Sequence, residues 1–181
     1  MRFKIHFMLI PLMCAAASHA ASLHYWVEPC PRAAALCQAG DPELAGWAME
    51  AWQTASGSRL KLIKSTDREH AQIRVLWIDG RAGLYGETRG GDVYVSTPAA
   101  SSDDALSRDA VVYLTCVHEI GHALGLAHTA DFADIMYSFQ YGGDIPEYFG
   151  RYRRQLSVRT DIRKHSGMSP DDRKRLLELY P

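Results

Sequence analysis

Cysteine is scarce in this sequence, with 4 residues in 181, and neither sign of charge is in excess, with 20 basic against 21 acidic side chains. Small domains that depend on several disulfides are far richer in cysteine, so that class is excluded. A formal net charge of −1 gives no support for nucleic-acid binding driven by phosphate neutralisation. With 47% hydrophobic and 23% charged residues, the chain is large and apolar enough to bury a core as one globular domain.

Long apolar runs are also missing, except at the amino terminus. Two basic residues precede an apolar stretch over 7–14 and the alanines after it, and residues 18–20 place small side chains where a signal peptidase cleaves. This pattern is typical of a secretory signal peptide. A membrane anchor is the alternative, but the run is shorter than the ~20 residues that a spanning helix needs. We therefore expect a signal peptide over 1–20 and a secreted or periplasmic domain over 21–181, with no stable membrane insertion.

Cleavage at that position would leave three cysteines in a compartment where disulfides persist. Cys30 and Cys37 have six residues between them and could close a small loop. In the chain-entropy model such a loop is worth about 2–3 kcal/mol. Cys116 would then be unpaired, and we expect it to be a small apolar side chain in the core.

Hydrophobic periodicity, with turn and cap residues between the periodic segments, predicts five short strands and three helices. Asp41-Pro42 is interpreted as an N-cap followed by proline at the first helical position, and Asp103 or Asp104 as the cap of the next helix. The expected strands cover 23–28, 60–63, 73–78, 84–87 and 92–97, and the expected helices 41–57, 104–125 and 169–180. Residues 129–168 are predicted to be irregular. The fold class is α+β, a mixed twisted sheet with two long helices packed on it.

One short motif carries the chemistry. His118 and His122 are four residues apart inside the second long helix, so both imidazoles project from one face and can reach one cation. Glu119 is offset from His118 by one residue, so its carboxylate can reach a water bound to that metal. Gly125 allows a sharp turn, after which His128 can return as a third ligand. Three neutral imidazoles suit one zinc ion and leave a fourth position for water.

The stretch HEIGHALGLAH, residues 118–128, resembles the HExxHxxGxxH signature of the metzincin metalloproteases. Met136, eight residues after the last histidine, resembles the methionine of their Met-turn. That spacing, with Tyr137 directly after the methionine, is similar to the matrixin branch. Astacins and serralysins usually have a zinc-binding tyrosine two residues after the methionine, where this chain has Ser138.

The resemblance implies a metzincin-like catalytic domain whose C-terminal subdomain contains the Met-turn and the final helix. Residues 91–95 resemble the strand before the active-site helix, and 169–172 the start of the last helix, whose aspartates anchor the chain terminus and the Met-turn in the family. Many matrixins hold a structural zinc through histidines, but residues 74–117 contain none, so we expect a single zinc. Asp79, Asp92 and the glycines between them could hold calcium through carboxylate and carbonyl oxygens.

It also implies a zinc-dependent endopeptidase that acts on protein or peptide substrates, and we expect a monomer. Zinc activates water and polarises the scissile carbonyl, and Glu119 moves the proton from that water to the leaving amine. The edge strand near Leu84–Glu87 would bind substrate by strand addition. A peptidase for one short or cell-wall peptide is a narrower alternative. A catalytically idle, zinc-containing binding protein that uses the same cleft is another, although binding a metal does not need Glu119.

Residues 151–164 carry six basic side chains against one aspartate. We weigh two interpretations of this segment. One is a solvated loop, and the other is a lid over the cleft that favours acidic substrates.

Overall fold

The structure is a computed structural model of the whole chain, and it describes residues 20–30, 37–80, 85–97 and 104–181. The predicted signal peptide falls almost wholly outside these residues, as does Leu84 of the predicted edge strand. No helix among the described residues is long and apolar enough to cross a membrane.

The described residues form five strands, four α-helices and two short 3-10 helices. In chain order the elements are β1 (Ala21–Val27), α1 (Asp41–Ala55), β2 (Leu60–Lys64), β3 (Ile73–Asp79), β4 (Gly86–Arg89), β5 (Asp92–Thr97), α2 (Ala105–Ala123), η1 (Phe139–Tyr141), α3 (Ile145–Arg153), η2 (Arg159–Lys164) and α4 (Pro170–Leu179).

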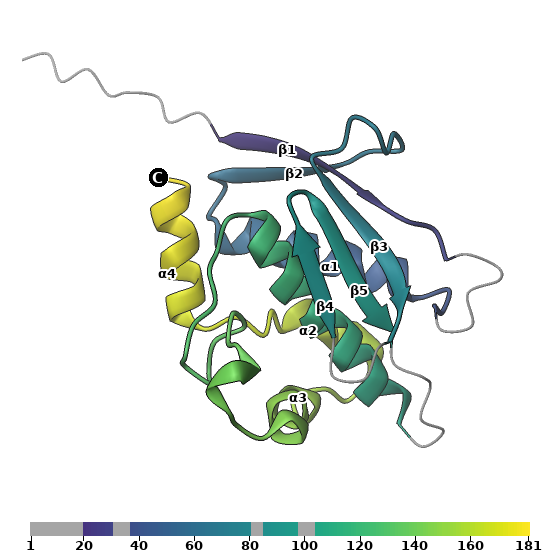
Figure 1. The fold of residues 1–181 in the computed structure, drawn as a ribbon, viewed down its shortest axis with the longest axis vertical. Coiled ribbons are helices and arrows are strands. Elements are labelled where there is room, and N and C mark those ends of the chain that lie inside the picture. Colours follow the sequence, from purple (N-terminus) through teal and green to yellow (C-terminus); the bar gives the residue numbers. More distant parts are fainter. Residues whose placement is uncertain (1–19, 31–36, 81–84, 98–103) are drawn as a thin grey trace, which may run out of the picture.

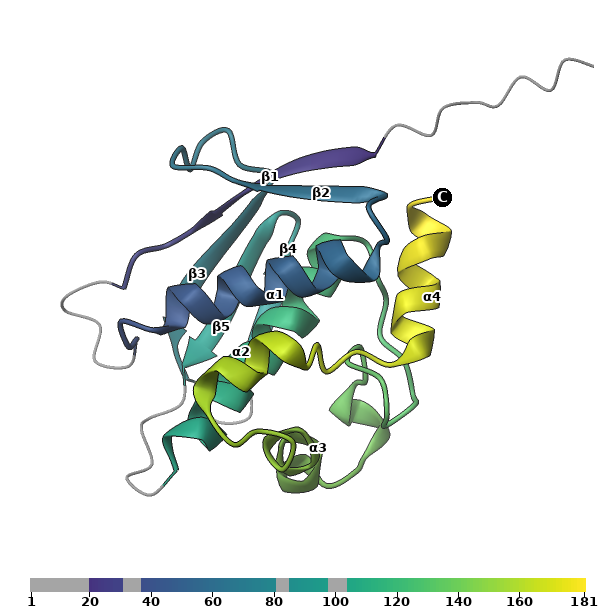
Figure 2. The same ribbon diagram turned by 180° about the vertical axis from the view of Figure 1, so that it is seen from behind.

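The strands form one mixed sheet in the order β2-β1-β3-β5-β4. The pairs β1–β2, β1–β3 and β3–β5 are parallel, and only β4 runs antiparallel, paired with β5. Both long helices, α1 and α2, lie against the same face of the sheet (Figures 1 and 2). The predicted mixed sheet with two long helices packed on it is therefore confirmed, and β4 is the edge strand on the side of α2.

The core lies between the sheet and these two helices. Val75 of the central strand β3 is fully buried, as are Trp52 of α1 and Cys116 of α2. The indole nitrogen of Trp52 donates to the backbone carbonyl of Val117 at 2.8 Å, which joins α1 to α2 without leaving a buried donor unpaired. The prediction that Cys116 is a core residue is confirmed. The packing of one face of α2 against α1 and the sheet thus fixes the position of this helix.

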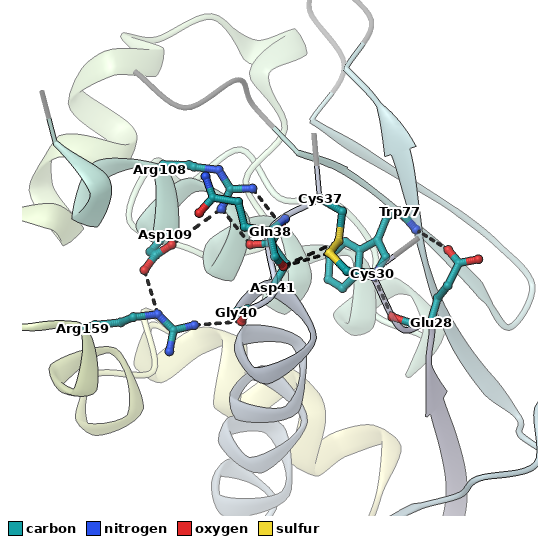
Figure 3. The surroundings of a disulfide bond; sticks show 10 residues. All are labelled: Glu28, Cys30, Cys37, Gln38, Gly40, Asp41, Trp77, Arg108, Asp109 and Arg159. Carbon is teal, nitrogen blue, oxygen red and sulfur yellow. Dashed lines mark hydrogen bonds and ion pairs between the residues drawn. A yellow bond between two sulfur atoms is a disulfide. The ribbon is translucent and has the colours of Figure 1, made fainter. Parts of the chain in front are cut away.

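A disulfide joins Cys30 and Cys37 beside the start of α1 (Figure 3). The prediction that Asp41 caps α1 is wrong: the N-cap is Gly40, and Asp41 is itself the first helical residue. The Asp41 carboxylate is buried and pairs with both terminal nitrogens of Arg108 on α2, each at 2.7 Å. A buried carboxylate with a bidentate guanidinium partner is satisfied, and removing either side would leave a buried charge.

The prediction of an irregular chain from 129 to 168 is also wrong. This stretch contains α3 and both 3-10 helices. Asp144 accepts a hydrogen bond from the Glu147 amide, and Pro146 occupies the first turn of α3. That cap-and-proline signature is the same one that marks the final helix, where Ser169 caps and Pro170 follows, so the sequence did contain the signal.

Of the two interpretations of residues 151–164, the loop is wrong in part: α3 and η2 order much of the segment, but the side chains of Arg154, Arg163 and Lys164 are 62%, 61% and 69% exposed to solvent. Each of the six basic side chains also has a partner within the protein. These partners are the Phe132 carbonyl for Arg151, Asp104 for Arg153, Glu147 for Arg154, Asp109 and Glu43 for Arg159, Glu50 for Arg163 and Asp161 for Lys164. The ion pairs of Arg153, Arg159 and Arg163 therefore connect the segment to α1 and to the start of α2.

Candidate active site

Three histidine side chains point at one another where α2 ends. His118 and His122 lie on one face of α2, and His128 returns to them after the helix. Gly125 makes this return possible, because its φ of +98° is a backbone conformation that side chains with a Cβ rarely adopt. The Nε2 atoms lie 3.1 Å apart between His118 and His122, 3.2 Å between His118 and His128, and 3.0 Å between His122 and His128. The structure thus brings together the three predicted histidines.

Hydrogen bonds on the far side of two of these rings decide which nitrogen faces the centre. Nδ1 of His118 lies 2.7 Å from the Ile135 carbonyl oxygen, and Nδ1 of His122 lies 2.8 Å from that of Leu126. A carbonyl can only accept, so we assign the ring proton to Nδ1 in both histidines, and each Nε2 then turns a lone pair to the centre.

Lone pairs that face one another at this distance repel unless a cation lies between them. The Nε2 spacing of 3.0–3.2 Å is close to the ~3.3 Å edge of a tetrahedral site with metal–nitrogen bonds of about 2.0–2.1 Å. These three side chains also form a group of potential metal ligands whose donor atoms all lie within 4.8 Å of one another. The triad therefore fits the zinc-binding HExxHxxGxxH motif.

Burial lowers the pKa of two of these rings, His118 and His128. Removal from water lowers the pKa of His118 to about 4, against the opposing effect of its bond to the Ile135 carbonyl. Removal from water also lowers the pKa of His128. Neutral imidazole is the form that can bind a metal ion, so both rings are available as ligands at neutral pH.

Glu119 lies beside the triad and is only 6% exposed. Its Oε2 is 2.8 Å from the hydroxyl of Thr88 on β4, which is also 2.8 Å from the Glu119 backbone carbonyl. Gly86 on the same strand leaves the room for this side chain, since a Cβ there would lie 2.6 Å from Glu119 Cγ. Burial raises the pKa of Glu119 to about 7, and the Thr88 hydrogen bond opposes part of that rise. This carboxyl group therefore gains and loses its proton near neutral pH.

Met136 lies buried directly behind the histidines. It packs on Gly121 of α2, where a Cβ would lie 2.5 Å from the methionine sulfur. The carboxylate of Asp172, at the start of α4, accepts the amide hydrogens of Ile135 at 2.7 Å and Met136 at 3.4 Å, and the amide of Thr129 donates to the Met136 carbonyl. A tight turn with a buried methionine under the histidine cluster is thus held by the final helix.

The same histidines, the glutamate and the methionine lie inside a stretch that matches a known family. The family model of the matrixins matches residues 20–146, which is more than half of the chain. The chain belongs to the matrixin family. A search of curated proteins gives no match to it.

The cleft of this matrixin opens above the triad, with a volume of about 590 Å³. The three histidines and Glu119 contribute its polar surface, and β4 borders one side. Five aromatic side chains that contact one another form an aromatic wall of this cleft: Tyr85, Tyr137, Phe139, Tyr148 and Phe149. None of the six basic residues of 151–164 is among the described residues that line this cleft, so nothing here supports the interpretation of that segment as a cationic lid.

Several residues of this matrixin site were not singled out from the sequence. Tyr148 and Phe149 belong to α3, whose cap signature was overlooked, and Thr88 meets Glu119 only through tertiary packing across 31 positions of the chain. Of the predicted calcium ligands, Asp92 binds the guanidinium of Arg74 at 2.5 Å, and the side chain of Asp79 lies outside the described residues. A calcium site therefore stays a prediction.

Proposed function

We propose that this matrixin is an exported zinc-dependent endopeptidase that hydrolyses peptide bonds in protein or peptide substrates. The observation that carries the proposal is the convergence of three histidine Nε2 atoms within 3.0–3.2 Å, beside a buried glutamate, at a cleft of about 590 Å³. Membership of a family of metalloproteases supports it.

His118, His122 and His128 would hold a single zinc ion through Nε2. When bound, zinc lowers the pKa of water in its fourth position and polarises a carbonyl oxygen. The Ile135 and Leu126 carbonyls accept the protons on the outer nitrogens of His118 and His122, which fixes the rings and makes them better donors.

Glu119 is the general base and then the general acid. Its carboxylate removes a proton from the attacking water and returns it to the nitrogen of the departing amine, so that the amine leaves uncharged. A carboxyl group with a pKa raised by burial to about 7 can both accept and release a proton near neutral pH. This role requires a short path between the carboxylate and the reacting carbon, which its place beside the triad provides.

Substrate backbone would pair with β4. This strand is at the edge of the described sheet, so one row of its backbone groups faces the cleft and not another described strand. An extended peptide can add there as a further antiparallel or parallel strand, and its side chains then reach the cleft walls. The aromatic wall favours an apolar side chain next to the scissile bond.

Two features support export. Residues 1–20 have the composition of a signal peptide, and Cys30 and Cys37 form a disulfide, a bond that persists in oxidising compartments. Monomeric state stays a prediction.

The test is cleavage of a mixed peptide library by three samples: the wild type, the wild type with a zinc chelator, and Glu119→Gln. We expect internal bonds to be cut by the wild type alone, with a loss of at least ~100-fold in the variant because glutamine cannot accept the proton. Zinc content should be equal in the wild type and the variant. Wild-type rates in Glu119→Gln would refute the assigned base, and no cleavage by a zinc-loaded wild type would favour a binding protein.

A further inference from the structure

We propose that Thr88 on the edge strand β4 is the residue that positions the carboxylate of Glu119, an inference that rests on the function proposed above. The hydroxyl of Thr88 lies 2.8 Å from Glu119 Oε2. No other side-chain hydrogen bond to the Glu119 carboxylate is described, and its Oε1 lies close to the bare backbone of Gly86, where an added Cβ would be 2.8 Å away. One hydroxyl therefore determines how a buried carboxylate is turned.

The carboxylate is the better of the two acceptors near that hydroxyl. Thr88 Oγ1 is also 2.8 Å from the Glu119 backbone carbonyl, but a hydroxyl has only one hydrogen to donate. A bond to an ionised oxygen is roughly twice as strong as a bond between neutral groups. Thr88 thus donates to Oε2 when Glu119 is ionised, and this leaves Oε1 to accept the proton of the attacking water.

Gly86 and Thr88 reach Glu119 from the same side of β4, because residues two apart in a strand share a face. The bare Cα of Gly86 lets the carboxylate lie flat against the strand: a Cβ there would be 2.8 Å from Oε1 and 2.6 Å from Cγ. The strand that would take up substrate along its edge therefore also holds the general base from its inner face. Binding and proton transfer are coupled through a single strand of four residues.

Thr88→Val tests the idea, because valine keeps the shape and the strand preference of threonine but lacks the hydroxyl. We expect kcat to fall about 10- to 100-fold with KM changed by less than about threefold, as for a catalytic group that is misplaced by a fraction of an ångström. Thr88→Ser keeps the hydroxyl and should restore kcat to within about threefold of the wild type. Equal kcat in Thr88→Val and the wild type would overturn the proposal, as would a loss that appears in KM alone.

Thr115→Val is the matched control. Thr115 lies one helical turn before Glu119 and is 4% exposed, and no described residue offers its hydroxyl a hydrogen-bond partner. The same loss of a hydroxyl, in the same part of the molecule, should therefore leave kcat within about twofold. If Thr115→Val lowered kcat as much as Thr88→Val, the effect would be one of local packing and the proposal would fail.

A double-mutant cycle separates this proposal from the function on which it rests. If Thr88 acts only through Glu119, Thr88→Val should add nothing to the loss caused by Glu119→Gln, measured in single-turnover reactions. A further loss of the same size in the Gln background would show that Thr88 acts independently and would refute the positioning role. Full activity of Glu119→Gln alone would instead refute the proposed base, so the two failures are distinct.

A spectroscopic measurement needs no activity. In the metal-free protein at pH 9, where Glu119 is ionised, the infrared carboxylate band of Glu119 is obtained as the difference between wild type and Glu119→Gln. We expect this band to shift in Thr88→Val and to return in Thr88→Ser, because the band position depends on the hydrogen bond to Oε2. An unchanged band in Thr88→Val would contradict the bond itself.

Discussion

The carboxyl group of Glu119 is an acid enclosed by protein, with one hydroxyl and no cationic side chain among the described groups that bond to it. A protein tolerates such a group when function requires it, at a cost in stability. The cost can be measured in the absence of metal, because a bound dication would counteract the rise of the Glu119 pKa.

In the metal-free protein we therefore expect Glu119→Gln to be more stable than the wild type above neutral pH and similar to it below pH 4.5. The folded pKa of Glu119 is about 7 against an ordinary value of 4.5, so the folded state binds this proton more tightly than the unfolded state. Its contribution to stability is fully present below pH 4.5 and is lost as the pH rises through 7, and the total is on the order of 3 kcal/mol. Urea unfolding of both proteins at several pH values measures the difference. A difference that did not change between pH 4.5 and 8 would contradict the raised pKa.

The histidines and Glu119 could be placed from the sequence because their relation is local. Helical geometry puts residues four apart on one face, and a glycine that can adopt positive φ brings the chain back for His128. The support of these residues could not be placed in the same way. Thr88, Ile135 and Asp172 reach the site from other elements. Thr88 is 31 positions from Glu119, and Asp172 is 37 positions from Ile135, so no local pattern indicates these contacts.

At the scale of elements, α2 and α4 were predicted well because each begins with a side-chain cap. Asp104 accepts the Ser107 amide, and Ser169 the Asp172 amide. The start of α1 was misassigned for a physical reason: Asp41 has the residue type of a cap, but the buried Arg108 of α2 takes its carboxylate. A tertiary ion pair outweighed a local preference.

The contact between α2 and the Met-turn predicts opposite effects for two helical glycines. A Cβ on Gly121 would lie 2.5 Å from the sulfur of Met136, so Gly121→Ala should lower the free energy of unfolding by about 1–3 kcal/mol through overpacking. Gly46 of α1 has no atom within 4 Å of its added Cβ, so Gly46→Ala should raise it by about 0.5–1 kcal/mol through helix propensity. Denaturant unfolding measures both. Equal effects of the two substitutions would contradict the packing of Met136 behind the histidines.

The ion pairs of residues 151–164 predict a structural role for the arginines. Arg159 bonds Asp109 at 2.9 Å and the Gly40 carbonyl at 2.8 Å, and its guanidinium lies over the ring of Trp47, so Arg159→Ala should cost about 1–2 kcal/mol of stability. Arg154 pairs only with Glu147 in the described structure, and its side chain is 62% exposed, so Arg154→Ala should change stability by less than about 0.5 kcal/mol.

Thermal unfolding measures the stability of Arg159→Ala and Arg154→Ala relative to the wild type. The turnover of acidic and neutral peptides by both variants is the control. Both variants should turn over the two peptide types in the wild-type ratio, because neither guanidinium lines the cleft. A selective loss on acidic peptides would restore the interpretation of this segment as a lid for anionic substrates.

For the molecule as a whole, the sequence predicted a mixed sheet covered by two helices. Local patterns could not predict the order of the strands in that sheet. The order β2-β1-β3-β5-β4 depends on which apolar faces pack together, and it is this order that leaves β4 at the edge beside α2. An edge strand, a histidine triad and a buried glutamate then border one cleft of about 590 Å³. We propose that all of them are parts of one zinc-dependent reaction centre.

Titration of the metal-free protein with zinc, with peptide cleavage followed at each step, tests that claim most directly. His118, His122 and His128 form the only group of three histidines that the described residues bring together, so activity should rise linearly and stop at one zinc per chain. The same titration of His128→Ala should give little or no activity at that ratio. Activity without zinc, or activity that needs two zinc ions per chain, would contradict the single triad as the reaction centre.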